Sequence, residues 1–191
     1  MSDGLHKPGR RLIGIDDGPF DRKRGANVLV VGVVCRGDRL DGVLTTHVRK
    51  DGWNATDRLI AMIRDSKFSA QLHGILLDGI TLGGLNIVDL PKLARDTGLP
   101  AIAVIRRKPD RQGMEDACGR LPNQGRRVAM LRRVGEVHEA EHVFFQVQGL
   151  SPDEARRVVD STAIFGYIPE PIRMAHLIGG GVITGQSGHR A

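Results

Sequence analysis

The sequence predicts an α/β protein with a mixed sheet, in which an antiparallel hairpin is followed by parallel strands and helices cover both faces. Three observations support this prediction. The β-branched run over residues 28–35 is typical of a strand buried on both faces. The turn Arg36-Gly37-Asp38 and the strand-like stretch 40–48 indicate the return strand of a hairpin. From residue 72 onward, strands alternate with helices, which favours parallel pairing.

The first half of the chain supplies most of the sheet and two helices. The apolar residues 12–15, followed by two aspartates, predict a short buried strand over 12–17. The stretch Asn54-Ala55-Thr56-Asp57 is typical of a helix start, and the apolar stripe after it predicts a helix to about Lys67. Beyond it we expect a buried strand over 72–78, a glycine-rich loop over 79–84, a helix over about 86–97 ended by Gly98 and Pro100, and a strand over 101–105.

The second half has weaker patterns. We expect a short helix around 114–118 and two half-exposed antiparallel strands near 127–131 and 142–148. Ser151-Pro152-Asp153-Glu154 is a capping box with proline at the first helical position, which predicts a helix to about Ala163. Another short helix is expected from Pro169 through His176, followed by a loose tail from Gly179.

Length and composition indicate one domain. The chain has 191 residues, of which 40% are apolar and 26% charged, as in ordinary soluble proteins. No apolar run approaches the roughly 20 residues of a membrane span, and no signal-peptide pattern opens the sequence. Cys35 and Cys118 show neither a disulfide framework nor a zinc signature, so we expect buried thiols in a cytoplasmic protein. We expect a flexible basic N-terminus over 1–10, the domain over 11–180 and a flexible tail over 181–191.

The chain is basic, with a formal net charge of +6 and a pI near 9.9. Arginine pairs recur along it, and the planar fork of arginine suits phosphate. A polyanionic partner fits this balance, although a solvated face explains any single pair at least as well. With one Trp, one Tyr and five Phe, rows of stacking platforms for single strands are not expected.

Three aspartates follow strands and are each followed within two residues by glycine: Asp16, Asp51 and Asp78. If the first strand lies parallel to the strand ending at Asp78, the two strands are about 4.8 Å apart and both acids lie at the carboxyl edge, where ligands of α/β sheets bind. Asp51, at the far end of the hairpin, can fall on that edge too. Carboxylate oxygens are ligands for Mg²⁺, with Mn²⁺ as the alternative. The sequence therefore predicts a metal site formed by these three acids.

Four stretches of the sequence carry a resemblance: GIDDGPF at 14–20, KDGWNAT at 50–56, LLDGITLGGLNIVDL at 76–90 and GYIPEPIRMAH at 166–176. In register over about residues 11–180, they resemble the endonuclease dU family, which is related to endonuclease V. The resemblance implies a ribonuclease H-like fold, in agreement with the order of strands and acids. It also implies incision of DNA at deaminated bases, deoxyuridine especially.

The resemblance further implies roles for individual residues. In endonuclease V-like enzymes, acids that match Asp16, Asp51 and Asp78 bind catalytic magnesium. His176 matches an acid or histidine near the metal, and Arg106 matches a basic residue, commonly lysine, that closes the following strand. Arg107 and Arg173 are expected to contact the nucleic acid. The base-displacing wedge of endonuclease V has no counterpart in Gly37-Asp38-Arg39, so hypoxanthine recognition by that device is not expected.

The residues themselves leave alternatives open at the acidic positions. Asp17 is expected to point to the opposite face of its strand and to have a structural role. Asp38 or Asp41 would replace Asp51 if the register of the hairpin differs from the expected one. Glu170 lies at a helix start, where the helix dipole favours a capping carboxylate.

The glycine-rich loop and His176 also have two interpretations each. Backbone amides of Gly79, Gly83 and Gly84 could bind a phosphate of the cut strand, or the loop could simply pack against the metal edge. His176 could be a packed helix residue, or it could orient water or assist a leaving group.

The sequence as a whole predicts magnesium-assisted phosphodiester hydrolysis, with Asp16 and Asp78 holding an ion, Asp51 completing the site and Arg106 positioning the backbone. Two other functions stay open: a non-catalytic nucleic-acid-binding module with the same fold, and a phosphatase acting on a small nucleotide. The preferred lesion, the choice between DNA and RNA, the position of the cut, the number of ions and the state as monomer or dimer are not determined by the sequence.

Overall fold

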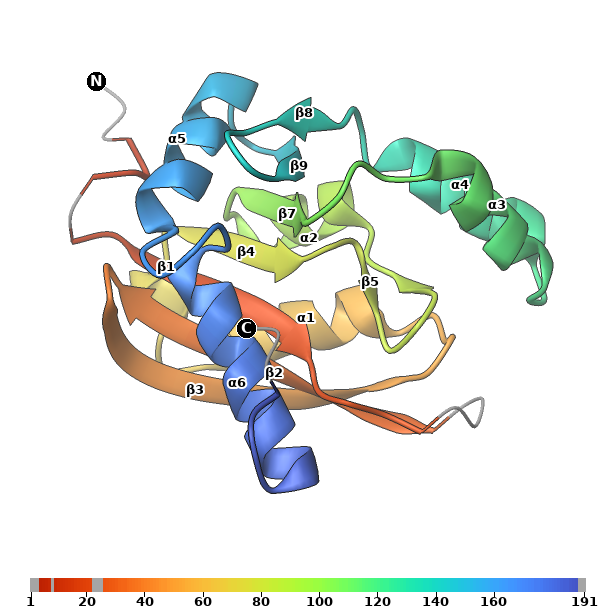
Figure 1. The fold of residues 1–191 in the computed structure, drawn as a ribbon, viewed down its shortest axis with the longest axis horizontal. Coiled ribbons are helices and arrows are strands. Elements are labelled where there is room, and N and C mark those ends of the chain that lie inside the picture. The colour runs from red at the N-terminus through yellow and green to blue at the C-terminus, as the bar shows by residue number, and fades with distance from the viewer. Residues whose placement is uncertain (1–3, 8, 22–25, 189–191) are drawn as a thin grey trace.

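A seven-stranded mixed sheet forms the centre of the computed structural model, which describes residues 4–7, 9–21 and 26–188. The strand order is β3-β2-β1-β4-β7-β9-β8 (Figure 1). The strands are β1 (Arg11–Asp17), β2 (Asn27–Arg36), β3 (Arg39–Arg49), β4 (Gly74–Asp78), β7 (Ala101–Ile105), β8 (His138–Glu139) and β9 (Phe144–Gln148). β5 (Thr81–Leu82) and β6 (Asn86–Ile87) form a separate small hairpin. Part of the expected basic N-terminus, residues 1–3 and 8, lies outside the described residues.

The pairing confirms the predicted mixture of antiparallel and parallel strands. β1 pairs antiparallel with β2, and β2 pairs antiparallel with β3. β4 pairs in parallel with both β1 and β7, and Ile15 of β1 lies opposite Leu77 of β4. The C-terminal ends of β1, β4 and β7 therefore meet at one edge of the sheet, which we call the carboxyl edge. Because β2 reverses direction and β3 returns, β3 also ends at this edge.

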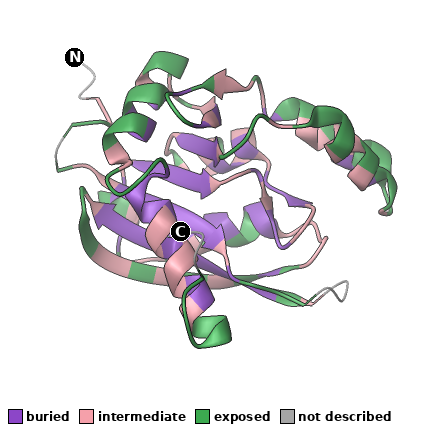
Figure 2. Cartoon of the chain, viewed as in Figure 1, coloured by how far each residue is buried: buried purple, intermediate pink, exposed green. Residues whose placement is uncertain are grey.

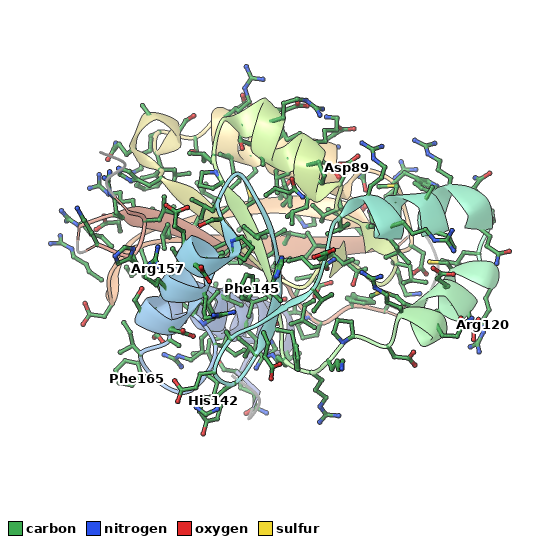
Figure 3. The ribbon with its side chains drawn as sticks, turned by 90° about the horizontal axis from the view of Figure 1, so that it is seen from above. Asp89, Arg120, His142, Phe145, Arg157 and Phe165 are labelled. Carbon is green, nitrogen blue, oxygen red and sulfur yellow. The ribbon has the colours of Figure 1, made fainter. Side chains whose placement is uncertain are left out.

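Helices cover both faces of the sheet, as predicted (Figures 1 and 2). On one face α1 (Ala55–Arg64) and α2 (Leu90–Thr97) pack over the larger core cluster. On the other face α5 (Pro152–Thr162) and α6 (Glu170–Thr184) cover a second cluster around the fully buried Phe145 (Figure 3). α3 (Arg111–Gly119) and α4 (Gln124–Arg133) extend beyond the carboxyl edge (Figure 1). A single 3₁₀ turn, Ser69–Gln71, precedes β4.

The predicted capping box of α5 is present. The Ser151 hydroxyl accepts a hydrogen bond from the Glu154 N–H at 3.3 Å, and the Glu154 carboxylate accepts one from the Ser151 N–H at 3.2 Å. These two bonds satisfy amides that the helix itself leaves unpaired.

Two elements in the middle of the chain differ in type or extent from the expected ones. Residues 127–131 belong to helix α4 and not to a strand, because helical spacing brings Arg127, Leu131 and Val134 to one face that packs against the body. The helix expected over 86–97 begins only at Leu90, since Asn86 and Ile87 pair within the β5–β6 hairpin.

The last helix is longer than expected. α6 continues through Gly179 to Thr184, so residues 181–184 are helical and do not belong to a loose tail. Its glycines allow a close approach, because a Cβ on Gly179 would lie 3.1 Å from the Cα of Gly18. The helix ends at Gly185, whose φ of 81° is a left-handed conformation that suits glycine.

Within the described part of the chain, no helix has the length and apolarity needed to cross a membrane. Cys35 and Cys118 are buried free thiols, as predicted. Burial raises the pKa of the Cys35 thiol to about 12, so this group is chemically inert at neutral pH.

Candidate metal centre

Asp16 and Asp78 lie next to each other because their strands are adjacent and parallel. Asp16 is the sixth residue of β1 and is buried, with 5% of its surface exposed. Asp78 is the last residue of β4. Since Ile15 and Leu77 are paired, the next residue of each strand reaches the carboxyl edge at the same level. The predicted convergence of these two acids is therefore present.

His176 reaches the same place from α6, which runs along β1. The close packing depends on Gly14, where a Cβ would lie 2.2 Å from the carbonyl carbon of Pro171. At the start of α6 the fully buried Glu170 accepts two hydrogen bonds from Arg173, one of them at 2.7 Å. Glu170 thus forms an ion pair with the next turn and is not the N-cap, which is Pro169. One turn further on, His176 Nδ1 lies 2.8 Å from Asp16 Oδ2.

The three side chains form a group that could hold a divalent cation. One ligand atom from each of Asp16, Asp78 and His176 lies within 4.8 Å of the other two. Burial, together with the charges of Asp78 and Asp17, raises the pKa of Asp16 from 3.8 to about 7, although His176 partly offsets this. A bound cation would remove the repulsion between the acids. Carboxylate oxygens suit Mg²⁺ or Mn²⁺ and an imidazole nitrogen also suits Zn²⁺ or Fe²⁺, so the donor set fits a divalent cation without selecting one.

Asp17 points to the other face of β1, as expected from the alternation of side chains. Its Oδ2 accepts a hydrogen bond from the Gly83 N–H of the β5–β6 hairpin. Burial raises the pKa of Asp17, and this hydrogen bond lowers it in part. Asp17 therefore has the structural role that the sequence suggested, since it ties the hairpin to the strand that carries Asp16.

Asp51 lies at the carboxyl edge, as predicted, but its side chain is not part of the three-residue cluster. Its two oxygens have other partners, because Oδ1 accepts from the Leu85 N–H at 2.9 Å and Oδ2 is 2.9 Å from Lys50 Nζ. Burial alone would raise the pKa of Asp51, but the Leu85 N–H and the Lys50 ammonium lower it below its usual value. Its φ of 53° directs the side chain toward the hairpin. This orientation depends on tertiary contacts that no local pattern shows.

The glycine-rich loop is a folded hairpin and does not open a helix. The Gly83 N–H is bonded to Asp17, and the Leu85 N–H to Asp51. Gly79 and Gly84 have φ values of 80° and 81°, and a Cβ on Gly84 would lie 2.4 Å from Asp51 Oδ1. The amide of Gly83 is thus already used by a protein carboxylate. The expectation that this segment opens a helix was wrong, because α2 begins only at Leu90; phosphate binding by the loop stays a prediction.

The predicted arginines lie in three different environments. Arg106 follows β7 and its guanidinium is 3.4 Å from Asp78 Oδ2, so it contacts the cluster. Arg107 is exposed next to it. Arg173 is held by Glu170, with its guanidinium 5.6 Å from the centre of the Phe165 ring. Asp41, the alternative to Asp51, lies at the opposite edge of the sheet, where it pairs with Arg11, Arg36 and Arg39.

A cavity of about 730 Å³ adjoins the cluster through Gly79, the neighbour of Asp78. Its walls come from the β5 segment, the end of β7, both helices of the α3–α4 pair and β9. Most of the lining is apolar and includes Ile80, Met114 and Leu131, while Gln146 contributes a buried amide. Because the cavity is built by segments that are far apart in the sequence, no local sequence pattern indicates it.

Arg127 is a second feature that was not predicted from the sequence. Its guanidinium is buried and donates to the carbonyl oxygens of Asp51, at 2.6 Å, and of Leu85 and Gly52. It also lies 4.2 Å from the centre of the Trp53 ring. The helical spacing to Leu131 and Val134 is the signal that could have shown that Arg127 faces inward.

Comparison with known proteins assigns the chain to a family. Residues 8–183 match the family described as Endonuclease dU. A UPF0215 protein of Archaeoglobus fulgidus is 41% identical over 181 residues, which are 95% of this chain and 98% of that protein. The crystal structure of a protein of unknown function from Archaeoglobus fulgidus superposes with a TM-score of 0.87 at 40% identity, covering 92% of this chain and 99% of that one.

Structures of endonuclease V share the fold at low identity. Human endonuclease V has a TM-score of 0.59 at 15% identity, over 94% of this chain and 88% of that one. Endonuclease V of Ciona intestinalis, in complex with DNA containing an inosine, has a TM-score of 0.55 at 14% identity, over 87% of this chain and 82% of that one. The predicted ribonuclease H-like fold is confirmed by these likenesses. Since the match to the family covers almost the whole chain, this protein belongs to the endonuclease dU family and shares its fold with endonuclease V.

Proposed function

We propose that this protein is a divalent-metal-dependent endonuclease that hydrolyses phosphodiester bonds in DNA at or near deaminated bases, deoxyuridine especially. The observation that carries the proposal is the convergence of Asp16, Asp78 and His176 at the carboxyl edge. Family membership and the fold shared with endonuclease V support a nuclease function. The complex of Ciona intestinalis endonuclease V with inosine-containing DNA supports DNA as the partner.

The proposed metal ligands are Asp16 and Asp78, with His176 beside them. A bound Mg²⁺ or Mn²⁺ would stabilise negative charge on the scissile phosphate and lower the pKa of a bound water. Asp51 has partners for both carboxylate oxygens, so we assign it the role of holding the β5–β6 hairpin against the carboxyl edge.

His176 and Arg106 have roles that follow from their contacts. Asp16 orients the imidazole through Nδ1, which leaves Nε2 to exchange a proton with water or with the leaving oxygen. Arg106 is partly exposed and touches Asp78 at one end, so it can donate to a phosphate next to the metal ligands. The carboxylate partner of each side chain fixes its position before substrate arrives.

The cavity beside Gly79 supports action on a base that leaves the helical stack. At about 730 Å³ it lies within the usual range of ligand pockets, roughly 300–1,000 Å³. Enzymes that read a displaced base use apolar walls and hydrogen bonds to its Watson–Crick edge. Gln146 Nε2 donates to the Gly135 carbonyl at 2.9 Å, which holds the amide in the wall. Its remaining donor and its acceptor match the carbonyl and N–H of a deaminated base such as uracil.

The amide of Gln146 can be tested against a matched neighbour. Gln148 lies on the same strand and donates to the Val134 carbonyl at 3.2 Å, but it does not line the cavity. Gln146→Leu should lower kcat/KM on uracil-containing DNA by about tenfold or more, because the base loses its hydrogen bonds. Gln148→Leu should cleave at close to the wild-type rate. Equal losses in both variants would remove Gln146 from lesion recognition.

The function itself is tested with a panel of duplexes and single strands that carry uracil, hypoxanthine or xanthine. We expect cleavage of the uracil-containing DNA with Mg²⁺ or Mn²⁺, and none after EDTA. Binding without cleavage under every condition would favour the non-catalytic binding module. Release of free phosphate from a nucleotide, with the DNA intact, would favour the phosphatase.

A further inference from the structure

The net positive charge of the chain is concentrated in one segment, residues 106–133. The whole sequence has 28 basic and 22 acidic residues, and this segment contains nine of the basic and three of the acidic ones. The rest of the chain is therefore balanced, with 19 of each sign. We call residues 106–133 the basic arm.

The basic arm projects from the carboxyl edge. It begins at Arg106, whose guanidinium contacts Asp78 of the metal cluster at 3.4 Å. Its two helices, α3 and α4, extend past the ends of β4 and β7, and most of their surface is exposed (Figures 1 and 2). Arg120 lies at the outer end of the arm (Figure 3). The charge of the protein thus extends outward from the place where the acids converge.

Many of these cations have no acidic partner. Arg132 and Arg133 pair with Glu115 and Asp89, both at 3.3 Å. Among the described residues, no carboxylate forms an ion pair with the exposed side chains of Arg107, Lys108, Arg111 and Arg120. A solvated surface helix usually mixes the two signs, so four cations in this arrangement favour an external polyanion.

The arm is fixed to the body at its base. The buried Arg127 bonds the carbonyl oxygens of Asp51, Gly52 and Leu85, and Trp53 lies against both Arg126 and Arg127, at 4.6 and 4.2 Å. Val134, directly after the arm, is buried in the main core. These contacts hold the exposed cations at a set position relative to Asp16 and Asp78. A surface that aligns a substrate with a catalytic site needs such a fixed position.

We propose that the basic arm is a clamp for the sugar–phosphate backbone of DNA, which it grips to one side of the bond that is cut. This inference rests on the proposed function for the identity of the polyanion. The arm supplies affinity that is independent of sequence and of the lesion, because contacts to phosphate position a protein without reading bases. Lesion recognition and hydrolysis belong to the cavity and the acid cluster.

The test compares two double variants that remove the same charge. Arg107→Gln with Arg120→Gln changes exposed arginines of the arm that do not line the cavity. Arg64→Gln with Arg157→Gln changes exposed arginines on α1 and α5, which form no ion pair among the described residues. Arg157 lies at the opposite end of the molecule from Arg120 (Figure 3). Binding to an undamaged, labelled duplex is measured in EDTA by fluorescence anisotropy, and thermal melts check that all proteins are folded.

The arm variant should bind about tenfold more weakly, and the slope of log Kd against log salt concentration should fall by up to about two, near one for each lost phosphate contact. The control variant should match the wild type. Equal slopes in the two variants would overturn the clamp.

The clamp and the proposed nuclease can fail separately. If the wild type cleaves none of the DNA substrates but the arm variant binds DNA more weakly than the control, the clamp is supported and the nuclease assignment is wrong. If the wild type cleaves uracil-containing DNA while the arm variant binds like the control, the nuclease stands and the clamp is wrong.

Discussion

The acids at the two edges of the sheet have opposite electrostatic surroundings. At one edge Asp41 lies within 4 Å of three guanidinium groups, from Arg11 at 2.7 Å, Arg39 at 3.4 Å and Arg36 at 3.7 Å. The hydrogen bond from Arg11 holds the pKa of Asp41 below its usual value. At the carboxyl edge Asp16 has two acidic neighbours and one histidine, and burial raises its pKa to about 7.

The difference separates an acid that stabilises the fold from acids that are arranged for a ligand. Asp41 is already neutralised by the protein, so it has no need of a cation. Asp16 and Asp78 are held close together although burial and the repulsion between their negative charges disfavour this. A divalent ion would offset that repulsion. Asp51 is intermediate, because Lys50 and the Leu85 N–H already satisfy its two oxygens.

The largest effect should come from removing one acid of the cluster. Asp16→Asn and Asp78→Asn should each lower metal-dependent cleavage of uracil-containing DNA by at least about 100-fold, because a neutral amide is a poor ligand for a hard cation. Asp41→Asn should cleave at close to the wild-type rate in the same assay, although it should melt at a lower temperature. Comparable losses in all three variants would show that the two edges do not differ in function.

A smaller effect is expected at Asp51. Asp51→Asn keeps an oxygen that can accept from the Leu85 N–H but loses the charge facing Lys50. Cleavage should fall by about tenfold, the order seen when a residue that supports metal ligands is changed. A loss as large as that of Asp16→Asn, together with loss of Mn²⁺ binding, would make Asp51 a direct ligand, as the sequence predicted.

The smallest expected effect is in thermal stability and depends on pH. A carboxyl whose pKa is higher in the folded than in the unfolded state contributes stability that is complete below pH 3.8 and is lost as the pH rises through about 7. Added Mg²⁺ or Mn²⁺ takes the place of the proton. It should therefore raise Tm more at about pH 8 than at about pH 5.5, by a few degrees, since 1 kcal/mol corresponds to about 2–4 °C at this size.

Two variants serve as controls for this measurement. Asp16→Asn should remove the pH dependence of the metal effect, because it removes the group that titrates. Asp41→Asn should keep it, since the lowered pKa of Asp41 places its own loss of stability on the acid side, below the range tested. A metal effect of the same size at both pH values in the wild type would argue against a cation beside Asp16.

Much of the fold and the centre of the site could be predicted, because both follow from strand order. Parallel pairing of two strands that each end in aspartate is enough to place Asp16 beside Asp78. The position of His176 followed from the motif around it, and the structure places it 2.8 Å from Asp16. Features that depend on long-range contacts could not be predicted in this way. The side chain of Asp51 turns toward Leu85 because of a left-handed backbone and a hairpin 34 residues away.

The segment after β7 shows the same limit in another form. The local sequence of residues 128–131 is compatible with a strand or a helix. The hydrogen bonds from the buried Arg127 to three carbonyl oxygens favour the helix that the structure shows. The continuation of α6 depends on the fit of Gly179 against Gly18, which is a contact between distant glycines.

The most direct test of the account is a crystal structure of the protein soaked with Mn²⁺, with anomalous scattering used to locate the ion. We predict a peak within coordination distance of Asp16 and Asp78 and close to His176, and no peak at that position in Asp16→Asn. A peak at Asp51 in place of this cluster, or none near any of these acids at saturating Mn²⁺, would contradict the assignment of the metal centre.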